Sequence, residues 1–537
     1  MIKNILWLWI LFIAAIFLYT FNLGEFPLRD WDEGIVATVA REISQADWSD
    51  RSWLYPVDIN NSPYWNKPPL IHNLIAFCYH FFGVSELITR CIPAMISAFC
   101  VPIIYLIGKE IFAVQRTAIF SAVVYLTLIP VVRHNRLAML DGAVTFFFCL
   151  IALFLLKLYN SHQNNNKEYQ KYYYFGVSLS FGLLCLTKGI AIALPALLIF
   201  ALFILANQKI FKELYFNKSL IIILVILVIG ISPAIFWYVL QYIRYGKTFI
   251  DYNLGTQTFN RVLNTVENNA QPFWYYLLEL VKYSLPWLLF LPQGIILAIK
   301  QRRQLWAKLS LIWFGVYLLV ISVMNTKLPW YIIPIYPAFA LLVGASLDKI
   351  IDLQKRKNYQ AIFYQLWLTI MTIALAFVTF ELFVLSLAEN IQQYDGLPTV
   401  GTILTIAFAF SSVLINKKSS FFVLTISIGL YFALLNLFTT PHSIWELAES
   451  YPVKPVAHLV RENTPATATI YTSYPYYRPS LNFYSDRSIV PLTEVNLPQI
   501  LRSQPKVYLL LSKDAASIPN SKVIANVDQW ILMVVTN

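Results

Sequence analysis

A polar stretch of the sequence, residues 22–69, carries two kinds of side chain that could do chemistry together. Asp32 and Glu33 stand near its start, and Lys67 stands near its end, directly before two prolines. A positioned carboxylate can take the proton of an attacking hydroxyl group. A lysine whose backbone is restricted by a following proline offers a cation of fixed position, which suits a phosphate. We therefore interpret 22–69 as a loop that holds a catalytic carboxylate, with Asp32 as the candidate.

The composition of the chain is that of a membrane protein. Of the 537 residues, 58% are hydrophobic and 13% are charged, whereas soluble proteins carry about 25% charged residues. The five cysteines lie in apolar segments without a CxxC pair, which is typical of buried free thiols. The sequence shows no phosphate-binding glycine loop and no zinc-ligand spacing among its six histidines. A soluble nucleotide-sugar site is therefore not predicted.

Thirteen apolar segments are predicted to be transmembrane helices, because about 20 mostly apolar residues cross a bilayer. They are 5–21, 86–108, 112–132, 141–158, 172–187, 190–206, 219–243, 283–299, 309–324, 331–347, 362–386, 401–416 and 420–439. The shorter apolar run 70–83 contains His72, Asn73 and His80, and we predict a partly embedded helix there. The predicted fold class is a polytopic α-helical membrane protein.

Basic residues are concentrated in alternate loops, which indicates how the chain crosses the membrane. Six loops hold 18 of the 40 lysines and arginines, and such loops face the cytoplasm. The N-terminus is then cytoplasmic, and the loop 22–69 lies on the outer side of a bacterial inner membrane. The net charge of +12 thus reflects topology and contacts with membrane lipids, and nucleic acid is not an expected partner. The 18 residues are Lys109, Arg116, Lys157, Lys167, Lys171, Lys209, Lys212, Lys218, Lys300, Arg302, Arg303, Lys308, Lys349, Lys355, Arg356, Lys357, Lys417 and Lys418.

The tail of the chain, from about Pro441, differs in kind because short β-rich runs alternate with helical stretches. We predict strands at 467–472, 481–484, 507–511 and 530–535, and helices near 455–461 and 494–503. The chain is therefore divided into a membrane domain, 1–440, and a small extracytoplasmic (periplasmic) α/β domain, 441–537.

The segment that begins at Asp32 has helical periodicity. Ile35, Val39 and Ile43 recur on one face, so an amphipathic helix at the membrane interface is predicted over 32–46. Asp32 shares that apolar face, which would aim its carboxylate toward a cavity on the membrane side. The alternative is that Asp30 or Asp32 caps the helix N-terminus.

Further ionisable residues stand at predicted helix ends on the same outer side. Asp141 and Lys188 are examples, and ionisable residues near membrane depth are costly and often functional. The alternatives are an ion pair between Asp141 and Arg136, a snorkelling Lys188, and a lipid headgroup anchor at Lys67. Two more cations on this side could bind phosphate, namely Arg261 and Lys327.

Several motifs of the sequence resemble those of family 39 glycosyltransferases, which include protein O-mannosyltransferases and the bacterial transferases that add aminoarabinose to lipid A. The resemblance implies a GT-C fold with an outer catalytic loop and a polyprenyl-phosphate-linked sugar donor. The motifs, in the family's order, are Asp32-Glu33-Gly34 with Ala40-Arg41-Glu42, Tyr64-Trp65-Asn66-Lys67-Pro68-Pro69-Leu70, Arg136 to Asp141, Leu186-Thr187-Lys188-Gly189, Gln271-Pro272-Phe273-Trp274-Tyr275-Tyr276, Lys327-Leu328-Pro329-Trp330-Tyr331 and Ser480 to Arg487.

The resemblance also implies roles for individual residues. Asp32 and Asp141 would be the catalytic carboxylates, and Lys67 would hold the donor phosphate. The reaction would invert the anomeric carbon, and the acceptor would be a lipid A-like lipid, another envelope glycan or a protein. The other expected substrate-binding residues are Arg41, Arg136, Lys188, Arg261, Lys327, Tyr331, Glu33 and Tyr64.

Two positions depart from the aminoarabinose branch. Asn66 stands where that branch usually has an acid, and Glu267-Asn268-Asn269 stands near its usual histidine. Both positions are associated with metal in that branch, so the usual ligands of a divalent metal are absent and no metal ligand or cofactor is predicted. Two alternative functions stand beside the transferase: one would use the same cations but would not need Asp32, and the other leaves the outer-face clustering of acids and bases unexplained. They are a transporter or flippase for lipid-linked sugars and a non-catalytic scaffold.

Overall fold

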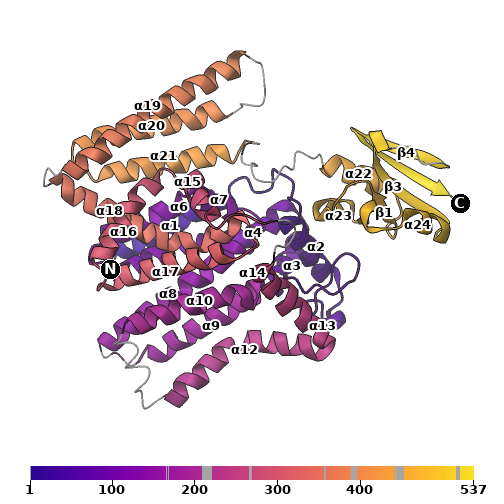
Figure 1. Cartoon of the computed structure of the whole chain (residues 1–537), viewed down its shortest axis with the longest axis horizontal. Coiled ribbons are helices and arrows are strands. Elements are labelled where there is room, and N and C mark those ends of the chain that lie inside the picture. Colours follow the sequence, from indigo (N-terminus) through magenta and orange to yellow (C-terminus); the bar gives the residue numbers. More distant parts are fainter. Residues whose placement is uncertain are drawn as a thin grey trace. The chain divides into compact units, whose positions relative to one another are not determined.

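The chain folds into two compact units, whose segments alternate along the sequence. The computed structural model describes residues 2–164, 166, 168–207, 220–264, 269–355, 359–388, 396–440, 442, 453–515 and 520–536. The helical unit comprises Met1–Asn22, Asn66–Pro68 and Pro93–Ser443, and the mixed unit comprises Leu23–Trp65, Pro69–Ile92 and Ile444–Asn537 (Figure 1). Most of the predicted catalytic loop therefore belongs with the C-terminal tail, while Asn66, Lys67 and Pro68 belong with the helical unit.

The helical unit consists of helices, of which many are long and apolar and several are short connecting turns. They are α1 (Ile2–Thr20), the second half of α4 (Glu86–Ala98), α5 (Cys100–Ile111), α6 (Gln115–Leu126), α7 (Ile129–Asn135), α8 (Asp141–Gln163), α9 (Gln170–Lys188), α10 (Ile190–Ala206), α12 (Leu220–Tyr245), α13 (Lys247–Ile250), η2 (Asp251–Phe259), α14 (Asn260–Leu263), α15 (Tyr275–Tyr283), η3 (Trp287–Phe290), α16 (Leu291–Lys300), α17 (Leu305–Val323), η4 (Pro329–Ile335), α18 (Tyr336–Lys355), α19 (Tyr359–Ala388), α20 (Leu397–Asn416) and α21 (Phe421–Leu437).

Each predicted span coincides with one of these helices or with two that adjoin. Among the described residues, seven helices are long and apolar enough to cross a membrane, or nine if each of two bent pairs counts as one span. The chain is therefore a multi-pass membrane protein, while the count of thirteen spans stays a prediction. The bends lie between α6 and α7, at 61°, and between α15 and the segment Trp287–Lys300, at 113°.

Ion pairs and hydrogen bonds join several of the basic loops to neighbouring helix ends in the helical unit. Arg116 lies 2.5 Å from Asp348 in the second half of α18, and Lys157 lies 3.2 Å from Glu110 at the end of α5. The ammonium of Lys308 donates to the carbonyl of Ala206 at the end of α10. These helix ends therefore meet on one side of the unit. Seven of the predicted cytoplasmic residues lie outside the described residues or have undescribed side chains, namely Lys167, Lys209, Lys212, Lys218, Lys355, Arg356 and Lys357.

Helices α9 and α12 approach each other closely because small residues line their contact. Ser178 and Gly182 are four residues apart on α9, and they face Gly230 on α12. A Cβ atom built on Gly230 would lie 2.8 Å from the backbone nitrogen of Leu179 and would overlap Ser178 Oγ. Small residues in this spacing let helix backbones approach in a membrane.

The mixed unit joins the N-terminal loop to the tail. Its N-terminal part holds α2 (Asp32–Gln45), η1 (Trp48–Asp50), α3 (Leu70–Phe82) and the first half of α4. The helix predicted over 32–46 is present to within one residue. Its N-cap residue is Trp31, which makes no side-chain capping hydrogen bond.

The tail contains a five-stranded sheet covered on both faces. Its order is β2-β1-β3-β5-β4, with β1 parallel to β2 and β3, and β5 antiparallel to β3 and β4. Residues of α22 and α23 pack on one face and residues of α24 on the other, because alternate side chains of each strand point to opposite faces. The elements are α22 (Val453–Asn463), β1 (Thr469–Thr472), α23 (Pro479–Ser485), β2 (Ser488–Pro491), η7 (Leu492–Glu494), α24 (Leu497–Ser503), β3 (Lys506–Ser512), η8 (Lys513–Ala515), β4 (Ser521–Val527) and β5 (Trp530–Thr536).

One predicted strand of the tail is wrong. The run 481–484 lies within helix α23, not in the sheet. Pro479 occupies the first turn of that helix, where its fixed φ angle and missing N–H are tolerated. Tertiary packing favours the helix because Leu481 packs against the sheet while Phe483 packs against Leu28 and Ala37.

The α9–α12 contact leads to a test of the helical unit. We expect Gly230→Ala to destabilise the protein by about 1–3 kcal/mol, since an added methyl group must push the two helices apart. Thermal unfolding in lipid nanodiscs measures this. The matched control is Gly315→Ala on α17, where no atom lies within 4 Å of the added carbon. An unchanged melting temperature for Gly230→Ala would contradict the close packing.

Candidate active site

A cavity of about 420 Å³ lies within the helical unit. One part of its wall is polar, and residues of α10 and α17 make the other part apolar. The polar side chains are Asn66, Lys67, Asp141, Lys188, Asn253, Gln257, Thr258, Arg261, Tyr317 and Tyr331. The apolar ones include Ile192, Leu194, Pro195, Leu319, Val320, Val323 and Met324. Such a wall can hold a ligand that has a charged head and an apolar chain.

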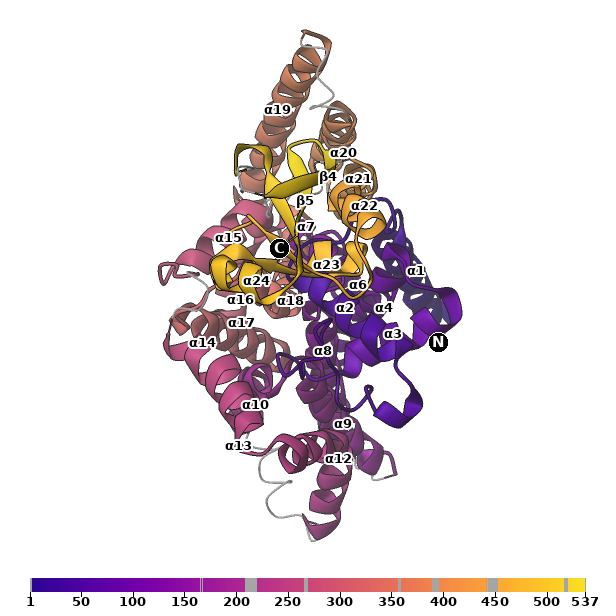
Figure 2. The ribbon, with the colours of Figure 1, turned by 90° about the vertical axis from the view of Figure 1, so that its right-hand side faces the viewer.

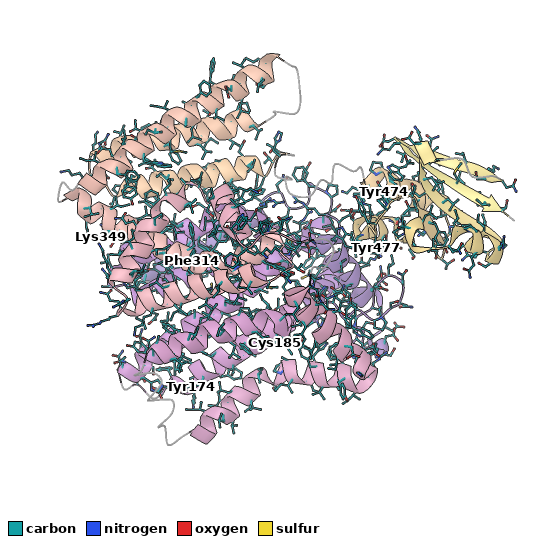
Figure 3. The ribbon with its side chains drawn as sticks, in the orientation of Figure 1. Tyr174, Cys185, Phe314, Lys349, Tyr474 and Tyr477 are labelled. Atoms are coloured by element: carbon teal, nitrogen blue, oxygen red, sulfur yellow. The ribbon has the colours of Figure 1, made fainter. Side chains whose placement is uncertain are left out.

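An ion pair joins two helix ends at the cavity. Lys188 Nζ donates to Asp141 Oδ1 at 2.6 Å, and the two side chains are only 12% and 6% exposed. Lys188 is the last residue of α9, one turn after Cys185 (labelled in Figure 3), and Asp141 is the first residue of α8. Each charge therefore also interacts favourably with the dipole of its own helix.

Tyr331 connects two of the cations. Its hydroxyl accepts a hydrogen bond from Arg261 Nη1 at 3.0 Å, and the Lys188 ammonium lies 5.4 Å from its ring centroid. The backbone carbonyl of Tyr331 accepts a hydrogen bond from the hydroxyl of Tyr317 at 3.1 Å. Tyr331 thus holds the cationic groups of α9 and α14 at the same place.

A π-helix contributes neutral polar groups to the cavity. The segment η2 has the i to i+5 hydrogen bonding that often marks functional sites, and it places Asn253, Gln257 and Thr258 in the wall. The hydroxyl of Tyr252, in the same segment, donates to Asn66 Oδ1. The amide of Asn66 is therefore oriented with its oxygen toward Tyr252.

The cavity has an excess of positive charge. Its described lining contains three cations, Lys67, Lys188 and Arg261, and one carboxylate, Asp141. Cations enclosed by protein are costly to desolvate, and an anion that binds among them offsets that cost. An anionic group such as a phosphate is the chemical partner that this arrangement favours.

The structure brings together five of the candidates from the sequence. Lys67, Asp141, Lys188, Arg261 and Tyr331 all line the one cavity. They come from positions far apart in the chain. Their roles in catalysis or binding stay predictions, but their convergence is a structural fact.

Two other candidates of the helical unit lie elsewhere. Arg136 is buried, donates to the carbonyls of Leu18 and Phe21 at 2.6 and 2.5 Å, and stacks over the ring of Phe438. It thereby satisfies carbonyl groups at the C-terminus of α1. Lys327 donates to the carbonyl of Met324, and burial lowers the pKa of its ammonium group. Neither residue is part of the cavity lining.

The remaining candidates belong to the mixed unit. Asp32 is the first residue of α2 and is half-buried. Glu33 is buried and accepts hydrogen bonds from Arg90 through both oxygens, at 2.7 and 2.8 Å. Arg41 donates to the carbonyl of Phe483, and the Tyr64 ring packs edge-on against His72. The contacts of Glu33, Arg41 and Tyr64 thus stabilise the unit itself.

Sequence reasoning did not identify the amide and hydroxyl groups of the π-helix as site residues. Asn253, Gln257 and Thr258 match no motif, and their only signal is a run of polar residues in a predicted outer loop. No three His, Cys, Asp or Glu side chains gather within the part of the chain that the structure describes. Glu267 and Asn268, near the predicted departure from the metal-binding branch, lie outside the described residues.

Comparison with known proteins shows what the chain resembles. Residues 7–245 match the family model of dolichyl-phosphate-mannose-protein mannosyltransferases. The structure superposes on ArnT from Cupriavidus metallidurans bound to undecaprenyl phosphate with a TM-score of 0.77, at 18% identity over 98% of this chain and 97% of that one. Residues 7–245 therefore resemble that family, and the chain as a whole has the fold of the ArnT structure.

The chain is also similar to several bacterial proteins. It is 26% identical to an uncharacterised protein of Aquifex aeolicus, over 91% of this chain and 89% of the relative. It is 26% and 25% identical to the undecaprenyl phosphate-alpha-4-amino-4-deoxy-L-arabinose arabinosyl transferases of Pseudomonas fluorescens and Aeromonas hydrophila. These matches cover 53% and 67% of this chain, and the chain spans only 50% and 63% of those two relatives. Both named relatives are transferases by name.

The buried ion pair at the cavity can be tested by a double-mutant cycle. Lys188→Met leaves the Asp141 carboxylate without its partner, and Asp141→Asn leaves the ammonium without its counter-charge. We expect each single variant to lose about 3 kcal/mol of stability, and the double variant to lose less than the sum. Thermal unfolding of the four proteins measures the coupling. Additive losses would show that the two charges do not interact.

Proposed function

We propose that the protein is an inverting transferase that moves a sugar from a polyprenyl phosphate to a hydroxyl group of an acceptor on the outer face of the inner membrane. The observation that carries this proposal is the cavity in which Lys67, Lys188 and Arg261 meet beside an apolar wall. The cations would bind the phosphate, and the wall formed by α10 and α17 would hold the first part of the prenyl chain.

In the proposed reaction, the acceptor oxygen attacks the anomeric carbon from the side opposite the phosphate. The bond between that carbon and the phosphate oxygen breaks, its electron pair stays on the phosphate, and the configuration at the carbon inverts. Charge develops on the phosphate, so fixed cations around it stabilise the transition state more than the ground state. Asp32 would take the proton of the acceptor hydroxyl.

Asp141 would act through Lys188 in this scheme. The 2.6 Å hydrogen bond fixes the ammonium while leaving the cavity with net positive charge. Tyr331 would do the same for Arg261. A fixed cation loses less entropy when it binds the phosphate, and this is a form of preorganisation.

The orientation in the membrane is part of the proposal. Arg116, Lys157 and Lys308, which belong to the predicted cytoplasmic loops, bond to neighbouring helix ends on one side of the helical unit. Lys188 and Asp141 stand at the opposite ends of α9 and α8 from the predicted cytoplasmic loop between them. This supports a cytoplasmic N-terminus, a cavity that opens on the outer side, and a periplasmic C-terminal domain.

The acceptor would be a lipid or glycan of the cell envelope, or a protein. The curated relatives named for aminoarabinose transfer favour a lipid A-like acceptor, and the matching family model is named for protein mannosylation. The donor-binding half of the reaction is common to both alternatives.

Substitution of Asp32 separates chemistry from donor binding. We expect Asp32→Asn to lower the transfer rate at least 100-fold, because an amide cannot accept the proton. Undecaprenyl phosphate should bind this variant as tightly as the parent. Release of polyprenyl phosphate from a panel of polyprenyl-phosphate sugars measures transfer, and a change in tryptophan fluorescence on addition of undecaprenyl phosphate measures binding.

Two further variants sharpen that result. Lys67→Ala should weaken the binding of undecaprenyl phosphate, since it removes one of the three cations. Glu25→Gln is the matched control, because Glu25 is an exposed carboxylate of the same loop. Parental transfer by purified Asp32→Asn would show that Asp32 is not the base.

Asn66 provides a test of which sugar is transferred. The amide oxygen of Asn66 accepts a hydrogen bond from Tyr252, and its amide nitrogen is a donor only. A donor group suits a sugar hydroxyl, which can accept a hydrogen bond, and does not suit an ammonium group, which cannot. We expect a neutral sugar donor to be used at least tenfold faster than an aminoarabinose donor. Asn66→Asp should reverse or reduce this preference because a carboxylate pairs with an ammonium group, whereas Asn66→Ser should not. Equal use of both donors by the parent would contradict this role.

A further inference from the structure

The turn before Asp32 has a costly backbone conformation. Trp31 has φ +61° and ψ −90°, which is unusual for a bulky residue. The N–H of Ile35 donates to the Trp31 carbonyl at 2.9 Å, so this residue sets the direction in which α2 begins. Such a conformation persists only where the surrounding contacts determine it fully, and it is common at functional sites.

Residues of the C-terminal domain hold the turn on one side. Arg478 Nε lies 2.5 Å from Asp30 Oδ2, and the Ser480 N–H donates to Asp30 Oδ1 at 3.0 Å. The Ser480 hydroxyl donates to the same oxygen. The side chains of Arg478 and Asp30 are 6% and 4% exposed, so both oxygens of a buried carboxylate are engaged by the tail.

The guanidinium of Arg478 is itself fixed by its neighbours. It lies 4.9 Å from the ring centroid of Tyr474, which in turn stacks on Trp530 at 4.1 Å. Tyr477, adjacent to Arg478 in the chain, packs its ring beside that of Trp31 at 6.5 Å. Figure 3 labels Tyr474 and Tyr477 in the tail. The Asp30 contact thus extends from the rigid sheet of the domain.

Arg90 holds the turn on its other side. Arg90 binds both oxygens of Glu33, and it donates to the carbonyls of Leu23, Phe26 and Pro27 at 2.7 to 2.8 Å. Glu33 Oε2 also accepts from the N–H of Arg29 at 3.0 Å. Asp32 therefore lies between two carboxylates, Asp30 and Glu33, whose positions are both fixed.

The helices that carry these groups touch without intervening side chains. A Cβ atom built on Gly34 of α2 would lie 2.6 Å from Ser480 N and 2.8 Å from Pro479 C, both of α23. Figure 2 shows α23 beside α2. Arg41 adds a hydrogen bond of 2.8 Å to the Phe483 carbonyl and an ion pair of 3.1 Å with Asp486. The domain and α2 are thus one packed body.

We propose that Arg478 and Ser480 are positioning residues for Asp32, acting through Asp30. The C-terminal domain then sets the position of the catalytic carboxylate. The proposal rests on the proposed function of Asp32 as the base. Every residue named for the donor cavity belongs to the helical unit, so loss of the Asp30 contact should affect the transfer step and spare donor binding.

The test uses the full-length protein in nanodiscs. Arg478→Gln removes the charge of the guanidinium, and Ser480→Ala removes one of the donors to Asp30. Each variant should lower kcat at least tenfold, with the KM for the donor and the Kd for undecaprenyl phosphate unchanged within twofold. Arg478→Lys, which keeps a cationic donor, should recover part of kcat. The matched control is Arg502→Gln, because Arg502 is an exposed arginine of the same domain.

A cysteine tether distinguishes positioning from folding. Ser488 Oγ donates to Asn60 Oδ1 at 2.6 Å, so Asn60→Cys and Ser488→Cys can be bridged across the same pair of segments. In the Arg478→Gln background, bridging with a short dithiol-reactive reagent should raise kcat at least threefold over the unbridged protein. The bridged pair in the parental background controls for effects of the tether.

Two results would overturn this proposal. One is a parental kcat in folded Arg478→Gln and Ser480→Ala, and the other is loss of kcat in proportion to loss of undecaprenyl phosphate binding. Failure of the proposed function gives a different pattern. In that case the parent would release no polyprenyl phosphate from any donor of the panel, or Asp32→Asn would be fully active whatever the Arg478 variants do.

Discussion

Confinement of positive charge beside an apolar wall is the constraint on which the rest of this structure depends. Among the described residues, three cations and one carboxylate line the cavity, and desolvation of the cations is costly without an anion. The chain reduces that cost by placing Lys188 and Asp141 at helix ends of suitable dipole and by linking Arg261 to Tyr331. The ends of α8, α9 and α14 and the start of η4 must therefore meet, and the helices that carry them are fixed by this requirement.

The second constraint is the position of the proposed base. Asp32 is attached to a different folding unit from the cations, and the contacts of its neighbours come from the C-terminal domain and Arg90. The C-terminal domain therefore contributes to the position of α2, since its helix α23 packs directly on α2. In the proposed reaction, this division would give the phosphate and the acceptor hydroxyl separate supports. Glu33 and Arg41 are close to Asp32 in sequence, and their contacts with Arg90 and Phe483 stabilise the unit that carries Asp32.

Sequence reasoning succeeded where one physical quantity dominates. Apolar length predicted each long helix. Lysine counts predicted one side for Lys67, Asp141 and Lys188, and these residues line one cavity, while the side of the membrane stays a prediction. Sequence reasoning could not predict which residues of that side share a cavity, because this depends on helix crossings and on bends such as the 61° break after α6. Arg136 and Lys327 are predicted on the same side, yet they bind nearby carbonyls.

The errors have similar causes. The run 481–484 has strand-like composition, but contacts of Leu481 and Phe483 on two sides favour a helix. The short strand β2 and the half-exposed strand β4 carry weak patterns and were not predicted. The π-helix also has no sequence signal, because its backbone hydrogen bonding is decided by the packing of its neighbours.

The excess of cations has a consequence for turnover. The proposed donor is a phosphodiester with one negative charge, whereas the lipid product is a phosphomonoester that approaches two charges near neutral pH. Lys67, Lys188 and Arg261 should therefore attract the spent lipid more strongly than the fresh donor. The same cations that assist bond cleavage would then slow the departure of the lipid product. Product release would limit the rate of the cycle, and accumulated polyprenyl phosphate would inhibit the enzyme.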